Sequence, residues 1–140
     1  MKIVFTDTNK LFGLFRAMIL HNSNFSWSVF VEYIKNNTVY ISTFVLSELS
    51  NISIRKWLSI SDSDIKTFVE KTWLRVYESS FVGVEEYHKY VLDKEDAQIV
   101  QDAVEIEATH ILTNNLKDFH KEYIFSKFNI SIVSELEEII

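Results

Sequence analysis

The sequence contains no cysteine, no proline and only two glycines, Gly13 and Gly83. The lack of cysteine excludes disulfides, thiolate metal sites and cysteine nucleophiles, and it fits a reducing compartment. The two glycines are too far apart to form the glycine-rich loop of a P-loop or of a dinucleotide-binding site, so neither motif occurs in the chain. Nucleotide-dependent chemistry of those kinds is therefore not expected.

Long apolar runs and excess basic charge are also lacking. No stretch approaches the roughly 18 apolar residues of a membrane span, and Asp7 ends the apolar start Ile3-Val4-Phe5 far short of a signal-peptide core. We therefore expect a cytoplasmic protein without membrane contact. The net charge of −6 argues against a protein that coats nucleic acid through a basic surface. That argument weakens if bound cations cancel some carboxylates locally and leave the lysines available for phosphates.

Hydrophobic residues make up 47% of the 140 residues, which predicts a packed core in one domain spanning residues 1–140. Apolar periodicity predicts strands at residues 2–6, 39–41, 110–113 and 130–133, while the segment 76–82 fits either a helix end or a short strand. Helices are expected at residues 9–20, 25–35, around Glu48, and at 61–78, 84–91, about 94–108 and from 134 onward. This alternation predicts an α/β fold, a three-layer sandwich with a mainly parallel four- or five-stranded central sheet.

Four acidic residues lie either after an expected strand or on a helix that connects two of them. Asp7 directly follows the first strand in Asp7-Thr8-Asn9, and Asp118 follows the strand at 110–113. Glu48 and Asp96 lie on helices that follow one strand and precede another. Ligands bind at the carboxyl ends of strands in open α/β sheets, so the fold would bring these acids to one edge. Divalent-metal binding is the chemistry that readily tolerates such crowding.

Taken together, these motifs resemble the PIN-domain ribonucleases, the family that includes the VapC-type toxins of bacterial and archaeal toxin–antitoxin pairs. The resemblance runs from the strand before Asp7 through Tyr40-Ile41-Ser42 and Glu48 to Asp96-Ala97-Gln98-Ile99-Val100 and the segment 111–119. It implies a PIN-like fold and Mg²⁺- or Mn²⁺-dependent hydrolysis of RNA phosphodiester bonds. It further implies a toxin with a cognate antitoxin, and a homodimer.

The resemblance also assigns roles to residues. The first three acidic positions of the family map to Asp7, Glu48 and Asp96. Many members carry Asp where this chain has Asn115, whereas others use the acid before the Phe, so the fourth position falls to Asn115 or Asp118. The implied catalytic and metal-binding residues are Asp7, Glu48, Asp96 and Asp118. Residues expected to fix carboxylate rotamers are Asn9, Thr113 and Asn115, and those expected to contact RNA phosphates are Lys10 and Lys117.

Each acid also has a purely structural interpretation. Asp7 suits a turn or helix cap, and Asp96 suits the first turn of a helix, where acids interact favourably with the helix dipole. Glu48 and Asp118 would be ordinary surface residues. Asp102 lies six residues beyond Asp96, about 120° around the helix, and we expect it to face solvent.

Two other functions compete with the nuclease. A catalytically inactive PIN-like RNA-binding or adaptor protein would keep the fold, and Asn115 is the motive for considering it. Phosphoryl transfer through a phospho-aspartate is disfavoured, because the position two residues after Asp7 is Asn9 rather than a second Asp.

Trp27, Trp57 and Trp73 lie in helical apolar patterns and are expected to be core or dimer contacts.

Overall fold

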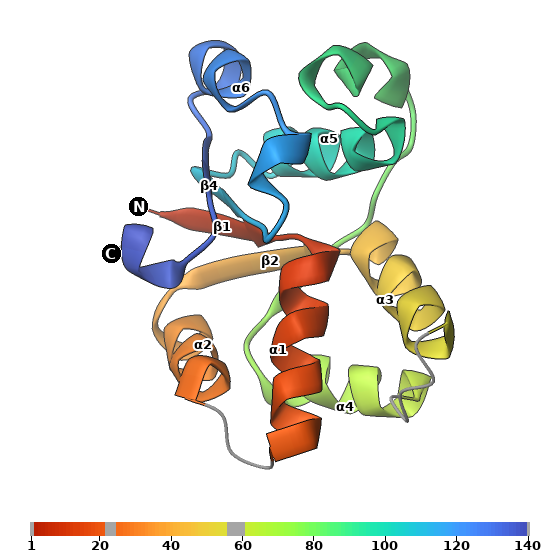
Figure 1. Cartoon of the computed structure of the whole chain (residues 1–140), viewed down its shortest axis with the longest axis vertical. Coiled ribbons are helices and arrows are strands. Elements are labelled where there is room, and N and C mark those ends of the chain that lie inside the picture. The colour runs from red at the N-terminus through yellow and green to blue at the C-terminus, as the bar shows by residue number, and fades with distance from the viewer. Residues whose placement is uncertain (1, 22–24, 56–60, 140) are drawn as a thin grey trace.

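The computed structural model describes residues 2–21, 25–55 and 61–139, with side chains described for these except 17–21, 25–27, 53–55 and 71. Five strands form one sheet in the order β3-β2-β1-β4-β5, and every pairing is parallel (Figure 1). Their bounds are β1 Ile3–Thr6, β2 Thr38–Ser42, β3 Arg75–Tyr77, β4 His110–Leu112 and β5 Ser131–Val133. The predicted α/β class is confirmed, with five strands.

The central strand β1 is covered on both faces. Val4, Phe5 and Thr6 follow one another and are each fully buried. Successive side chains of a strand point to opposite faces, so burial of consecutive residues requires packing on both sides of the sheet. Ile111 and Leu112 of β4 are buried in the same way. This pattern corresponds to the expected three layers.

Helices surround the sheet on two sides. Figure 1 shows α1, α2, α3 and α4 below β1 and β2 in that view, with α5 and α6 above them. Phe15 of α1 and Phe68 of α4 pack edge to face, with ring centroids 4.6 Å apart. The α-helices are α1 Thr8–His21, α2 Phe25–Asn36, α3 Thr43–Arg55, α4 Asp62–Lys71, α5 Ala97–Glu105 and α6 Lys121–Phe128, and the 3-10 helices are η1 Val84–Tyr90, η2 Lys94–Asp96, η3 Leu116–Asp118 and η4 Leu136–Glu138. None of the helices in the described ranges is long and apolar enough to cross a membrane.

The helix expected at 61–78 is shorter than predicted. It starts with a capping box between Ser61 and Asp64 and ends at Lys71, and residues 75–77 form the edge strand β3. Trp73 follows the end of the helix, so the helical pattern does not apply to it, and it is 74% exposed. The prediction of a core position is therefore wrong for Trp73. The side chains of Trp27 and Trp57 lie outside those described.

Three predictions in the C-terminal half also differ from the structure. The segment 84–91 forms the 3-10 helix η1 rather than an α-helix, and helix α6 was not predicted at all. The helix expected to reach about residue 108 ends at Glu105, and Glu107 has the left-handed φ of 58°. The helix expected from residue 134 onward is a single 3-10 turn, with a capping box between Glu135 and Glu138.

Asp102 is fully buried, and the prediction that it faces solvent is wrong. The prediction assumed that α5 exposes one face, as an amphipathic surface helix does. Every residue from 97 to 103 is buried instead. The reason is that η1 packs against α5.

Candidate functional site

The acidic residues gather at the carboxyl edge of the sheet. Thr6 of β1 pairs with Leu112 of β4, and the N–H of Asp7 donates to the carbonyl of Leu112 at 2.9 Å. The chain continues from β1 to β2 and β3 on one side, and later to β4 and β5 on the other. The crevice between β1 and β4 is therefore the point where the strand order reverses, the usual ligand position in such sheets.

Asp7 is buried at this crevice, with 3% of its surface exposed. Its Oδ2 accepts a hydrogen bond from the Thr113 hydroxyl at 2.8 Å, and its Oδ1 accepts from the N–H of Thr8 at 2.6 Å. Its carbonyl accepts from the N–H of Leu11, so Asp7 also occupies the cap position of α1. Burial raises the pKa of Asp7, the bonds from Thr113 and Thr8 oppose that rise, and the charge of Asp118 adds to it.

Glu48 lies on α3, which begins directly after β2. Its Oε1 accepts a hydrogen bond from the Thr8 hydroxyl at 2.7 Å. Thr8 thus contacts Asp7 through its backbone and Glu48 through its side chain. Thr8 has no predicted role, and it connects two of the predicted site residues.

Asp96 ends the short helix η2, which Asp93 caps by accepting from the N–H of Glu95 at 3.0 Å. Burial, followed by the charges of neighbouring carboxylates, raises the pKa of Asp96 to about 7. Those neighbours are Asp7, Asp93, Asp118 and Glu48. The fold therefore brings the four predicted acids close enough for their charges to act on one another.

Asp118 lies at the end of η3, where its charge raises the pKa of both Asp7 and Asp96. The N–H of Asn115 donates to the Thr113 hydroxyl at 3.1 Å, and its carbonyl accepts from the N–H of Asp118 at 3.0 Å. Asn115 therefore shapes the turn that follows β4. Its position also supports the orientation of the Thr113 hydroxyl toward Asp7.

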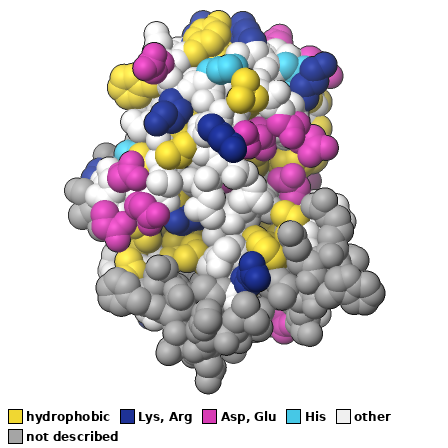
Figure 2. All heavy atoms as spheres, viewed as in Figure 1, with side chains coloured by type: hydrophobic (Ala, Val, Ile, Leu, Met, Phe, Trp, Pro, Cys, Tyr) yellow, Lys and Arg dark blue, Asp and Glu magenta, His cyan; other side chains and the backbone are white. Residues whose placement is uncertain are grey.

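The donor set suits a hard divalent cation, because all four side chains offer carboxylate oxygens. Within the described residues, no three Asp, Glu or His side chains are arranged to hold one ion directly. Mg²⁺ keeps several of its waters, so the set fits an ion that is held partly through water. Figure 2 shows a group of acidic side chains on the right of the molecule. In the same view, Figure 1 shows the end of β1 and the start of α3 in that region.

Two other predicted residues make different contacts. The Lys10 ammonium donates to the carbonyl of Ser134 at 2.7 Å and lies 3.6 Å from a carboxylate oxygen of Glu135. Asn9 is exposed, and its carbonyl accepts from the Asn114 side chain at 3.3 Å. No hydrogen bond joins the Asn9 side chain to a site carboxylate in the part of the chain described. Lys10 would have to leave Ser134 to contact a phosphate.

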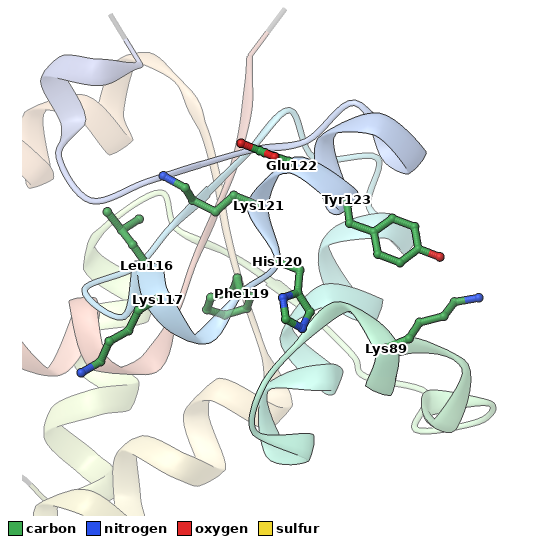
Figure 3. A pocket seen from close by; sticks show the side chains of 8 residues that line it. All are labelled: Lys89, Leu116, Lys117, Phe119, His120, Lys121, Glu122 and Tyr123. Carbon is green, nitrogen blue, oxygen red and sulfur yellow. The ribbon is translucent and has the colours of Figure 1, made fainter.

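Lys117 lies next to Asp118 and lines a cavity of about 780 Å³. Two further lysines, Lys89 and Lys121, line the same cavity together with His120 and one acidic residue, Glu122. Figure 3 shows Lys117 and Lys121 on one side of it and Lys89 on the other. None of these lysines forms an ion pair with another described residue. The acidic site therefore has a basic hollow beside it, although the chain as a whole is acidic.

A second polar cluster, which the sequence analysis missed, surrounds Asp102. Its Oδ2 accepts from the Ser79 hydroxyl and its Oδ1 from the Gln98 amide, both at 2.8 Å. Burial raises the pKa of Asp102, and the hydrogen bonds from Ser42, Gln98 and Ser79 oppose that rise. The spacing of four between Gln98 and Asp102 was the available signal, because such residues lie on one face of a helix.

Comparison with known proteins supports the fold. No family model matches the sequence, and a search of curated proteins finds no match. A chain in the "Crystal structure of VapBC2 from Rickettsia felis bound to a DNA fragment from their promoter" matches with a TM-score of 0.58 and 20% sequence identity, covering 93% of this chain and 96% of that chain. The match establishes a shared fold, and the predicted likeness to the VapC-type PIN fold is confirmed at that level.

Proposed function

We propose that this chain is a metal-dependent endoribonuclease that hydrolyses RNA phosphodiester bonds with Mg²⁺ or Mn²⁺. The observation that carries the proposal is the buried carboxylate of Asp7 at the strand switch point, surrounded by the charges of Asp96, Asp118 and Glu48. Such crowding disfavours the folded protein unless a cation compensates for it. The lysines of the cavity beside Asp118 offer contacts for the phosphates of the substrate.

The proposed roles follow from the contacts. Asp7, Asp96 and Asp118 hold the ion directly or through water, and Glu48 holds it or orients the attacking water. The ion supplies Lewis-acid chemistry, lowering the pKa of a water and stabilising the charge that builds on the phosphate. Thr113 fixes the rotamer of Asp7 by its 2.8 Å hydrogen bond, and Thr8 positions Glu48 in the same way. We favour Asp118 over Asn115 as the fourth acidic position, because its charge acts on both Asp7 and Asp96.

The fold also suggests a biological setting. The similar chain comes from a VapBC2 structure that contains a promoter DNA fragment. We infer that the present chain is the toxin of a toxin–antitoxin pair, with a cognate antitoxin protein that restrains it, and that it forms a homodimer in the cytoplasm.

The test is cleavage of RNA by the purified protein with Mn²⁺ or Mg²⁺, with the ends of the fragments mapped by sequencing. The Asp7→Asn variant should lose more than about a hundredfold in rate, because even residues that only orient a metal ligand contribute about 10- to 100-fold. Its melting temperature in chelator should equal or exceed that of the native protein. The control is Asp62→Asn, which removes an exposed charge on α4.

Two results would contradict the proposal. RNA binding without cleavage in the presence of either ion would favour the inactive adaptor, the alternative that Asn115 suggests. A marked fall in the melting temperature of Asp7→Asn in chelator would mark Asp7 as a structural cap of α1.

A further inference from the structure

Phe81 adopts a strained backbone conformation and presents an exposed ring. Its φ is 61°, a left-handed value that is an outlier for a bulky residue. Its side chain is nevertheless 53% exposed, so the strain is not offset by burial of the ring in the core. Strained residues persist where the surrounding structure imposes them, and they cluster at functional sites.

The segment around Phe81 is anchored by buried polar groups. The N–H of Ser79 donates to the Thr43 hydroxyl at 3.0 Å, and the Ser79 hydroxyl donates to Asp102 at 2.8 Å. After Phe81, the carbonyl of Val82 accepts from the side chain of Gln101 at 2.6 Å. The bonds on both sides of Phe81 hold the backbone in place, and they explain how the strained conformation is maintained.

Phe81 lines a cavity of about 710 Å³ that reaches the proposed catalytic site. Glu48 lines the same cavity, and Phe44 packs its ring against Phe81 with centroids 6.2 Å apart. Gln98, also in the wall, is 4% exposed, and its Oε1 has no hydrogen-bond partner among the described residues. Its amide donates to Asp102, so the Gln98 oxygen is a buried acceptor whose capacity is unused among the described residues.

We propose that this cavity receives an unpaired nucleobase of the RNA substrate, stacked on Phe81 beside the phosphate that is cleaved. The inference rests on the proposed function, because it is the shared residue Glu48 that places the cavity next to the reacting phosphate. The wall holds the carboxylates of Glu48 and Glu95 and the single ammonium group of Lys94, so its net charge is negative and a neutral base suits the cavity better than the charged backbone does. Aromatic side chains bind bases of single strands by stacking on them.

The experiment compares two variants of Phe81 with a matched control. Phe81→Ala removes the ring, and Phe81→Gly removes it while also relieving the strain, because glycine accepts a positive φ. Phe125→Ala is the control, since Phe125 on α6 is 52% exposed and lies outside the cavity. Binding of single-stranded RNA oligonucleotides is measured by fluorescence anisotropy in chelator, and KM and kcat are measured with Mn²⁺.

Both Phe81 variants should weaken RNA binding and raise KM by roughly five- to a hundredfold, the range expected for loss of one stacked base. Phe81→Trp should restore binding, and Phe125→Ala should bind like the native protein. Phe81→Gly should melt at an equal or higher temperature than the native protein. A role confined to folding would instead lower the melting temperature and leave binding by the folded fraction unchanged.

Several outcomes would overturn the inference. It fails if the native protein cleaves RNA and both Phe81 variants match it, in which case the proposed nuclease activity survives. It fails equally if the Phe81 variants change only the sedimentation of the protein, because Phe81 would then contact a second copy of the chain. It also fails if the variants change only the binding of an apolar peptide, because the cavity would then bind protein rather than RNA. If the native protein binds RNA through Phe81 without cleaving it, the nuclease proposal fails and the base-binding cavity stands.

Discussion

Two carboxylates near the same helix, Asp96 and Asp102, are accommodated in opposite ways. Asp102 is fully buried and receives hydrogen bonds from Ser79 and Gln98. Asp96, at the start of α5, has other carboxylates as its charged neighbours, and its pKa rises to about 7. No side chain in the described segments donates a hydrogen bond to it.

The comparison separates a structural acid from a candidate functional one. A buried carboxylate supplied with donors is tolerated in the folded chain without any ligand. A group of carboxylates without compensating donors raises the free energy of the folded state until protons or a cation neutralise it. The two environments therefore predict different responses to mutation, to pH and to metal.

The largest expected effect on stability comes from Asp102. Asp102→Ala leaves buried donors of Ser79 and Gln98 without an acceptor, which should lower the free energy of unfolding by about 2–4 kcal/mol. In chelator, Asp96→Ala should have a free energy of unfolding equal to or higher than that of the native protein. Urea denaturation of both variants measures the difference, and equal losses in the two would break the comparison.

A smaller effect is expected from pH, because Asp96 is partly exposed and water screens the charges around it. The pKa of Asp96 is about 7 in the folded protein and near 3.8 when unperturbed, so the folded state binds the proton more tightly between these values. The stability of the metal-free protein should therefore fall as pH rises from about 4 to about 7. The raised pKa values of Asp7 and Asp102 act in the same direction.

Melting in chelator at pH 5 and pH 8 measures this fall, and Asp96→Asn should reduce it. Stabilisation by Mn²⁺ should grow over the same interval, because the ion binds the deprotonated carboxylates. A metal-free protein that is more stable at pH 8 than at pH 5 would refute the assignment.

The smallest effect is expected from Thr113. Thr113→Val keeps the shape of the side chain and removes the hydroxyl that donates to Asp7. The Mn²⁺ concentration for half-maximal stabilisation should rise about tenfold, as is usual when a group that orients a ligand is removed. Titration with Mn²⁺ followed by thermal melting tests this, with Thr67→Val on the exposed face of α4 as the control.

Most of the fold could be predicted from the sequence because β1, β2, β4 and β5 are short apolar runs that end in polar residues. Asp7 and Asp118 could be proposed because they follow strands, whereas Glu48 and Asp96 lie on connecting helices and could be proposed only through the resemblance to the PIN-domain pattern. The edge strand β3 is only partly apolar, and because its Arg75 and Val76 are exposed, the sequence does not distinguish it from the end of a helix.

The environment of Asp102 could not be predicted from local periodicity. Its burial depends on η1, which comes earlier in the chain and packs over α5. The strain at Phe81 depends in turn on bonds to residues in two other parts of the chain, Thr43 on α3 and the adjacent Gln101 and Asp102 on α5. Such contacts arise from tertiary packing, which overrides local preference.

The pairing of β1 with β4 bears on when the acidic site can form during synthesis. The hydrogen bond from Thr113 to Asp7 joins residues 106 positions apart. Contacts between distant parts of a chain form late, because closing the loop between them is entropically costly. A nascent polypeptide that has not yet emerged from the ribosome beyond Asp118 cannot bring the four acids together.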